Sequence, residues 1–225
     1  MEALERKLHY NFRNRALLAE ALNHSSYANE HRGAGICSNE RLEFLGDSIL
    51  GFVTAEHLFK IYPDLPEGDL TRIRAALVCE QSLYEVAQHL ELGQYLKLGR
   101  GEESGGGRYR QSILADAVEA VFAAIYLDSD MASISRIIHA VLLDKATDHV
   151  VEERRDYKTA LQELVQREEG STLTYRLVGE SGPDHNKLFV FEVLINGRSA
   201  GQGSGHSKKE AEQSAARDAL EKMGQ

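Results

Sequence analysis

The chain has 225 residues, of which 42% are hydrophobic, so it can form the core of one large or two unequal domains. Its net charge of −9 argues against a generic basic coat for nucleic acid, and no apolar run approaches the roughly 18–20 residues that a membrane span needs. Cys37 and Cys79 form neither a CxxC pair nor a zinc-ligand spacing, which favours reduced thiols in a cytoplasmic protein. The N-terminus is charged from its second residue, so we expect no secretory signal.

Residues 1–148 have the pattern of a helical domain. Apolar residues recur at spacings of three and four in RALLAEALNHSSY, RIRAALVCEQSLYEVAQHL and ASISRIIHAVLLDKA. The segment GRGEESGGGRYRQ, in which Gly105 to Gly107 are consecutive, predicts a flexible loop. We therefore expect an all-α N-terminal domain over residues 1–150.

Residues 149–156 are short and charged, which predicts a linker or a helix end, and the pattern changes after them. A helical segment is followed by TLTYRLVGESG and KLFVFEVLING, which are rich in β-branched and aromatic residues and predict strands. Asn196-Gly197 predicts a hairpin turn, and RSAGQGSG a third strand. Ser207 and Glu210 form a capping box that opens the last helix. Residues 156–225 are thus predicted to form a small α+β domain in the order α-β-β-β-α.

The acidic excess is unevenly distributed. Residues 156–225 contain 9 Lys+Arg against 11 Asp+Glu, a balance of −2, which leaves 17 against 24, or −7, for residues 1–155. This difference is what we expect if the first part collects cations.

The segment NERLEFLGDSIL places Glu40, Glu43 and Asp47 at spacings of three and four, on one stripe of a helix. The rest of this helix is apolar almost all round, which predicts that it is buried in its own domain. Partial burial and mutual repulsion would raise the pKa values of the three acids, so a positive group should compensate them.

A second apolar helix repeats the pattern. The segment ILADAVEAVFAAIYL contains only two ionisable acids, Asp116 and Glu119, at i and i+3. If the two helices face each other, four carboxylates meet at the edge of a core, and carboxylates suit Mg²⁺ or Mn²⁺. Neither stripe contains His or Cys, which disfavours zinc.

Each acid has a plainer interpretation when it is taken alone. Glu40 could be a solvated acid at a helix start, and Asp47 a core acid paired with Arg or a backbone donor. Asp116 and Glu119 could form a solvated stripe on a half-exposed helix. Two such pairs on two apolar helices together favour metal binding, whose common uses are phosphoryl chemistry and hydrolysis.

Lys208 and Lys209 open the last helix of the C-terminal part, where backbone N–H groups and the helix dipole favour anions. The preceding GQGSGHS contains glycines that allow close backbone approach. This arrangement predicts phosphate binding, and the alternative is a solvated helix start with ordinary surface lysines.

These segments resemble a known family. NERLEFLGDS, SILADAVEA and LTRIRAALV resemble the signature blocks of ribonuclease III. TALQELVQ, GPDHNK and GSGHSKKEAEQSAARDAL resemble a double-stranded-RNA-binding domain. The resemblance covers nearly the whole chain, in the order found in a bacterial ribonuclease III.

The resemblance implies a divalent-metal-dependent endoribonuclease, which hydrolyses double-stranded RNA to 5′-phosphate and 3′-hydroxyl ends with short 3′ overhangs. Ribosomal and other structured RNA precursors are the expected substrates. Mg²⁺, with Mn²⁺ as a substitute, is the implied cofactor, and no organic cofactor is expected. The family also works as a homodimer through its N-terminal domain. The implied metal ligands are Glu43, Asp47, Asp116 and Glu119, with Asp47 and Glu119 as the catalytic pair and Glu40 and Glu67 as accessory acids near the substrate.

In the C-terminal domain the resemblance implies three sets of RNA contacts. Thr159, Gln162 and Glu163 would contact 2′-hydroxyls in one minor groove, and His185 would reach a second. Ser207, Lys208 and Lys209 would hold the phosphates between them, a geometry that reads A-form shape.

The sequence departs from the family pattern at Ser25, Cys79 and Gln111, none of which is one of the four acids. Two rival functions share part of the pattern. One is a non-catalytic RNA-binding protein whose acidic helices form only a dimer core. The other is a DNA nuclease, which the 2′-hydroxyl-reading domain disfavours.

Overall fold

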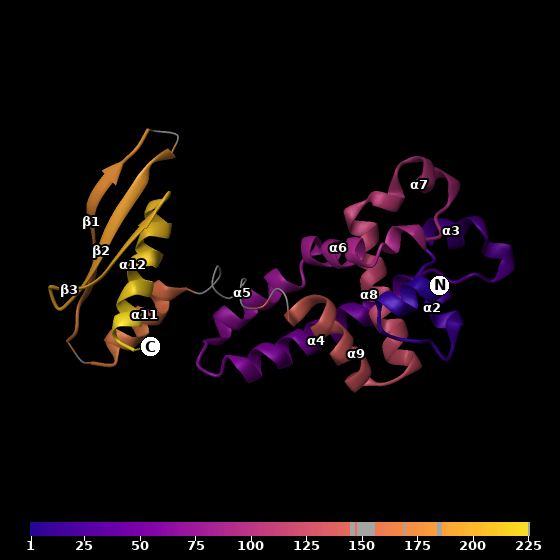
Figure 1. Cartoon of the computed structure of the whole chain (residues 1–225), viewed down its shortest axis with the longest axis horizontal. Helices are drawn as coiled ribbons and strands as arrows, with labels where there is room; N and C mark the ends of the chain where they lie inside the picture. Colours follow the sequence, from indigo (N-terminus) through magenta and orange to yellow (C-terminus); the bar gives the residue numbers. More distant parts are fainter. Residues whose placement is uncertain (145–146, 148–155, 169, 184–185, 225) are drawn as a thin grey trace. The chain divides into compact units, whose positions relative to one another are not determined.

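The computed structural model describes residues 1–144, 147, 156–168, 170–183 and 186–224. The chain divides into two compact units, Met1–Arg154 and Arg155–Gln225 (Figure 1). Of the segment 149–156, predicted as a linker, only Asp156 lies within the described residues. No described helix is both long enough and apolar enough to cross a membrane.

The first unit is helical, as its apolar spacing predicted. Two features depart from plain α-helix: short 3₁₀ turns join several helices, and a π-turn follows α9. The elements are α1 (Glu2–Lys7), α2 (Arg15–Ala21), α3 (Ser25–Glu30), η1 (Arg32–Ala34), α4 (Glu40–Ile61), α5 (Glu67–Leu77), α6 (Glu80–His89), η2 (Leu92–Gln94), α7 (Arg100–Ser104), η3 (Gly107–Tyr109), α8 (Gln111–Asp128), α9 (Met131–Ile138) and the π-turn η4 (His139–Leu143).

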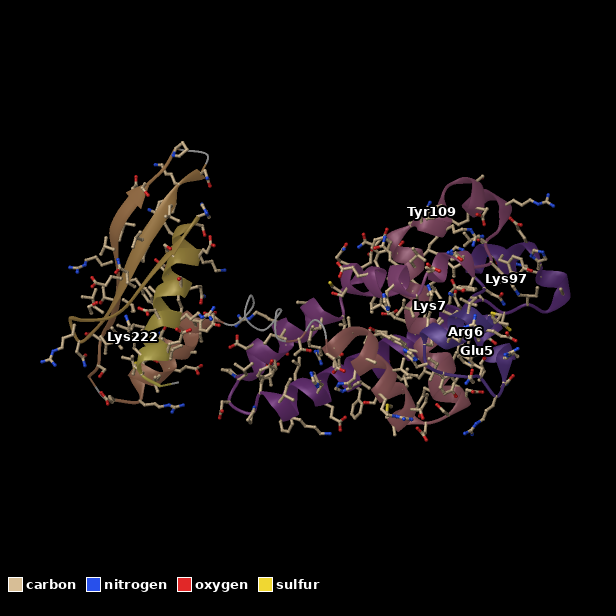
Figure 2. The ribbon with its side chains drawn as sticks, in the orientation of Figure 1. Glu5, Arg6, Lys7, Lys97, Tyr109 and Lys222 are labelled. Carbon is tan, nitrogen blue, oxygen red and sulfur yellow. The ribbon has the colours of Figure 1, made fainter. Side chains whose placement is uncertain are left out.

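Helix α8 is the central element of this unit (Figure 1), and it is buried along most of its length, as predicted. Its far end is held by Asp128, which accepts hydrogen bonds from the Tyr10 hydroxyl at 2.7 Å and the Asn14 N–H at 2.7 Å. Near the same N-terminal segment, the buried Glu5 accepts a hydrogen bond from the Phe12 N–H at 3.0 Å (Figure 2). The C-terminal end of the core helix is therefore fixed by the N-terminal segment of the chain.

Helix α4 packs against α8, but it is not buried all round. Its inner face includes Leu50 and Val53, each 1% exposed, whereas Phe44, Phe52 and Phe59 are 78%, 55% and 73% exposed. The prediction of a fully buried helix is wrong for this face. An apolar stripe of this size on a single chain is typical of a surface that another molecule covers.

The glycine-rich segment 100–110 forms α7 and η3 rather than an extended loop. Glu103 pairs with Arg108, and Glu102 pairs with Arg110 at 2.7 Å, so two ion pairs bridge the glycines. Arg108 also donates to the Leu96 carbonyl at 3.0 Å, which fixes the segment that leads into α8.

The second unit has the predicted α+β order. It contains α11 (Tyr157–Gln166), β1 (Leu173–Ser181), β2 (Leu188–Ile195), β3 (Arg198–Gly205) and α12 (Lys208–Lys222). The strands form an antiparallel sheet in the order β1-β2-β3, and both helices lie on one face of it (Figure 1). Asn196 and Gly197 join β2 to β3 with φ values of 51° and 76°, as a two-residue hairpin requires.

The glycines of β3 allow α12 to lie directly on the sheet. A Cβ added to Gly203 would lie 2.2 Å from the Ala215 backbone nitrogen, and one added to Gly201 would lie 2.5 Å from the Ala215 carbonyl oxygen. The facing alanines of α12, Ala211 and Ala215, are completely buried. The glycines before α12, which predicted a close backbone approach, allow β3 to approach α12.

Candidate functional site

Three of the predicted acids come together in the first unit. One carboxylate oxygen from each of Glu43, Asp116 and Glu119 lies within 4.8 Å of the other two. Glu43 comes from α4, and the other two come from α8, as the pairing of the two helices predicted. All three side chains are partly buried, so the group lies at the edge of the core.

Gly46 explains how the two helices come close enough. A Cβ at this position would lie only 1.9 Å from the carbonyl oxygen of Glu119, so any side chain would push α4 off α8. Glu43 lies three residues before this point of contact. The close backbone approach therefore places the Glu43 carboxylate opposite the acids of α8.

Glu119 is the most strongly perturbed member of this group. Burial, followed by the nearby negative charges of Asp47, Asp116 and Glu43, raises its pKa to about 8. A carboxyl with such a pKa is ready to lose its proton to a cation that enters the site.

Glu43 and Asp116 are perturbed in the same direction. Burial raises the pKa of Glu43 first, followed by the charges of Asp116, Glu40 and Asp47. For Asp116 burial again acts first, the charge of Glu80 adds to it, and the charge of His24 opposes it. Glu80 was missed by sequence reasoning, because it opens α6 and only the fold brings it toward Asp116.

Asp47 lies outside the 4.8 Å group, although it is one turn after Glu43 on the same helix. Its side chain is exposed, and it is close enough to Glu119 to raise the pKa of that carboxyl. Glu40 is exposed and accepts a hydrogen bond from the Ser38 hydroxyl at 2.7 Å. Glu67 is exposed at the start of α5 and accepts one from the Thr71 hydroxyl at 2.8 Å. None of these three acids belongs to the group of carboxylates within 4.8 Å of one another.

The donor set suits a hard divalent cation. Three carboxylates from two helices offer oxygen ligands, which Mg²⁺ and Mn²⁺ prefer. Burial and, after it, neighbouring negative charge raise the pKa values of these three acids, and a bound cation would lower those pKa values again.

In the second unit the predicted RNA contacts lie on exposed positions of the two helices. Thr159, Gln162 and Glu163 are exposed on α11. Lys208 and Lys209 are exposed in the first turn of α12, where the Ser207 hydroxyl accepts a hydrogen bond from the Glu210 N–H at 3.1 Å. Glu210 in turn accepts from the His206 N–H at 2.8 Å, which completes the predicted capping box one residue further out. His185 lies outside the described residues.

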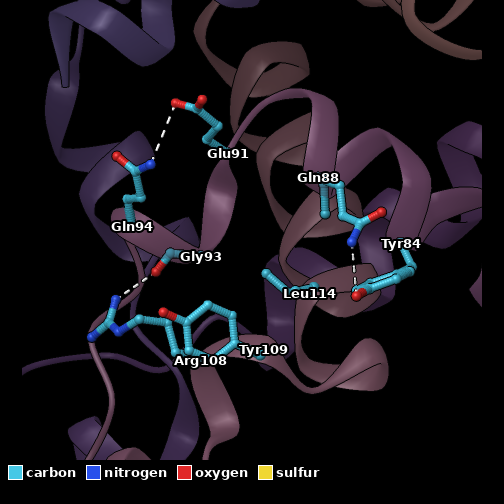
Figure 3. A pocket seen from close by; sticks show the side chains of 9 residues that line it. Tyr84, Gln88, Glu91, Gly93, Gln94, Arg108, Tyr109 and Leu114 are labelled. Atoms are coloured by element: carbon cyan, nitrogen blue, oxygen red, sulfur yellow. Dashed lines mark hydrogen bonds between the residues drawn. The ribbon is translucent and has the colours of Figure 1, made fainter.

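A separate pocket of about 270 Å³ lies beside α6, η2 and η3 (Figure 3). On one side of it Gln88 donates a hydrogen bond of 2.9 Å to the Tyr84 hydroxyl, one turn earlier on α6, and on the other side Arg108 donates to the Gly93 carbonyl. None of its lining residues is one of the predicted acids, so the pocket is not part of the carboxylate group.

Two family models match the chain, one for each unit. Residues 14–146 match a ribonuclease-III-like model, and residues 157–223 match the double-stranded RNA binding motif. Both matches define the same class of protein, an endoribonuclease that carries its own RNA-binding domain.

Individual relatives agree with this class. "Ribonuclease 3" of Desulforamulus reducens is 53% identical, over 98% of this chain and 92% of the relative. "Ribonuclease 3" of Caldanaerobacter subterraneus subsp. tengcongensis is 52% identical, over 98% and 97%. The nuclease domain of ribonuclease III from Campylobacter jejuni, in a structure described as flexible in the region involved in dimer formation, is 37% identical with a TM-score of 0.57, over 68% of this chain and 96% of that one. The chain belongs to the ribonuclease III family.

Proposed function

We propose that this enzyme is a Mg²⁺-dependent endonuclease of double-stranded RNA, with Mn²⁺ able to replace Mg²⁺. The observation that carries the proposal is the meeting of Glu43, Asp116 and Glu119 at the edge of the nuclease core. A bound divalent ion would supply an activated water and stabilise the leaving oxygen of a phosphodiester. The proposed products carry 5′-phosphate and 3′-hydroxyl ends with short 3′ overhangs.

The protein's own residues have distinct proposed roles. Glu43, Asp116 and Glu119 hold the ion, and Asp47 joins them as a ligand by a rotation of its exposed side chain. Asp47 and Glu119 form the proposed catalytic pair, and after burial the charge of Asp47 is the next contribution to the raised pKa of Glu119. Glu40 and Glu67, both exposed, are proposed to line the path of the RNA near the site.

We propose a homodimer formed through the N-terminal domain, in which each subunit cuts one strand. The exposed stripe of Phe44, Phe52 and Phe59 on α4 supports this assembly, because a second copy would remove its apolar surface from water. An assembly with two sites also suits the chemistry, since one site of fixed polarity cannot easily cut two antiparallel strands.

In the second unit, the proposed RNA contacts are one minor groove for α11, a second for His185, and the intervening phosphates for Ser207, Lys208 and Lys209. The helix N-terminus and two exposed lysines support the phosphate contact. Cytoplasmic processing of ribosomal and other structured RNA precursors is the cellular role we propose.

The proposal is tested by incubating the protein with a long RNA duplex, the matching DNA duplex and the single RNA strand, each with Mg²⁺ and with a chelator. We expect cleavage of the RNA duplex alone and only with the metal, and sequencing of the products should show the proposed ends. Equal cleavage of DNA would favour the rival DNA nuclease. Binding of duplex RNA without any cleavage would favour the non-catalytic RNA-binding protein.

A further inference from the structure

Asn39, the residue directly before α4, is buried and does not cap its own helix. It is 4% exposed, and its side chain makes no capping hydrogen bond to the first turn of α4. The side-chain Nδ2 instead donates to the carbonyl of Ala21 at 3.2 Å, the last residue of α2. An asparagine directly before a helix usually caps that helix. Asn39 instead pairs with a carbonyl at the C-terminal end of α2.

The backbone of Asn39 is fixed as well. Its N–H donates to the carbonyl of Asn23 at 2.9 Å, and its own carbonyl accepts from the N–H of Glu43 at 2.9 Å. Asn23 is itself buried, and its side chain donates to the Cys37 carbonyl at 3.2 Å. The two asparagines thus tie the segment before α4 to the segment after α2 through three hydrogen bonds.

Asn23 extends the same connection to a third segment. It pairs with Lys97 in an isolated parallel bridge, and the His24 N–H donates to the Lys97 carbonyl at 3.1 Å. The charge of His24, the next residue, lowers the pKa of Asp116 in the carboxylate group. The anchor of α4 therefore belongs to the structure that surrounds the site.

Glu43 lies between two fixed points of its helix. Asn39 anchors the chain four residues before it, and Gly46 contacts the backbone of Glu119 three residues after it. A helix held at only one of these points could rotate or slide about the other. With both, the direction of the Glu43 side chain relative to Asp116 and Glu119 is set.

We propose that Asn39 is a positioning residue for metal binding, which acts by holding Glu43 in register with the acids of α8. This inference rests on the proposed function of the three acids as metal ligands. Groups that orient the ligands of a metal typically change its affinity 10–100-fold when they are removed.

The test is direct binding of Mn²⁺ alone to the full-length protein, followed by electron paramagnetic resonance in the absence of RNA. For Asn39→Ala we expect the Mn²⁺ dissociation constant to rise about tenfold. In cleavage assays kcat at fixed Mg²⁺ should fall and recover at higher Mg²⁺, while KM for duplex RNA changes less than twofold. If Asn39→Ala does not fold, Asn39→Ser takes its place, since a serine hydroxyl keeps a polar group but cannot reach the Ala21 carbonyl.

The matched control is Val53→Ala, a buried position on the same helix about 15 Å from Glu43 along the axis. It should lower Tm without changing Mn²⁺ affinity. Unchanged Mn²⁺ binding in the Asn39 variants, or equal weakening by Val53→Ala, would overturn the positioning role. If the unaltered protein binds no Mn²⁺, the proposed metal site itself fails, and that result is distinct from a normal site that is insensitive to Asn39.

Discussion

At the scale of single residues, the clearest energetic cost of this fold is the partial burial of the Glu119 carboxyl among other acids. Its carboxyl is partly buried among Asp47, Asp116 and Glu43, and its pKa is raised to about 8. In the unfolded chain the same carboxyl returns to its ordinary pKa near 4.5. Between these two values the folded protein holds a proton that the unfolded chain has released.

The stability of the metal-free protein should therefore fall as the pH rises from about 5 to 8, because the folded state must then ionise Glu119 at a cost. Glu119→Gln removes this cost. In thermal melts with a chelator we expect the variant to exceed the unaltered protein in Tm by about 3 °C at pH 8, with little difference at pH 5. Mg²⁺ should narrow the gap at pH 8 by stabilising the unaltered protein. A gap of the same size at both pH values would contradict the raised pKa of Glu119.

At the scale of elements, the contact between α4 and α8 positions the site. Gly46 permits this contact, since no side chain fits between its Cα and the backbone of Glu119. The order of the carboxylate group thus depends on a residue that has no functional group of its own.

Gly46→Ala should force the two helices apart and lower both stability and activity. We expect a loss of about 1–3 kcal/mol in stability, seen as a lower Tm, and a fall in kcat of about 100-fold, since a displacement near 1 Å can cost that much. The control is Gly101→Ala, an exposed helical glycine whose added Cβ would meet no atom within 4 Å. It should leave kcat unchanged and leave Tm equal or slightly higher. A fully active Gly46→Ala protein would show that the close approach is dispensable.

The sequence predicted the individual helices and strands better than the contacts between them. The apolar pattern predicted α8 as a core helix, and the spacing of Asp116 and Glu119 predicted which acids share its stripe. Periodicity within one helix cannot reveal a neighbour, so the exposure of Phe44 on α4 was not foreseen. The same limit applies to Glu80 and Asn39, whose roles arise from segments that are distant in the sequence.

At the scale of the whole molecule, the RNA-binding unit has almost no net charge, so its contact with phosphates must be local. Removal of both lysines, by Lys208→Ala with Lys209→Ala, should reduce the slope of log affinity against log salt by about 2 for duplex RNA. The control is Lys222→Ala, which lies at the other end of α12 and pairs with Asp218 at 2.6 Å (Figure 2). An unchanged slope in the double variant would remove these lysines from the contact surface.

The proposed dimer predicts a mass of two copies in solution, each of 25.0 kDa. Phe52→Asp should yield single copies, because it places a charge in the apolar stripe while disturbing the core little, its side chain being 55% exposed. Leu127→Asp, on an exposed position of α8, serves as the control and should remain dimeric. Sedimentation equilibrium distinguishes these results, and a single-copy mass for the unaltered protein would contradict the dimer.

The most direct test of the carboxylate site is single-turnover cleavage of a short RNA duplex over a range of Mg²⁺ concentrations. We expect Glu119→Gln to reduce the rate at least 1000-fold at ordinary Mg²⁺ while it still binds the duplex, because it removes a ligand charge from the group. The matched control is Glu56→Gln, an exposed acid of α4 that pairs with Lys60 at 2.8 Å, and its rate should equal that of the unaltered protein. Undiminished cleavage by Glu119→Gln would contradict the assignment of the site.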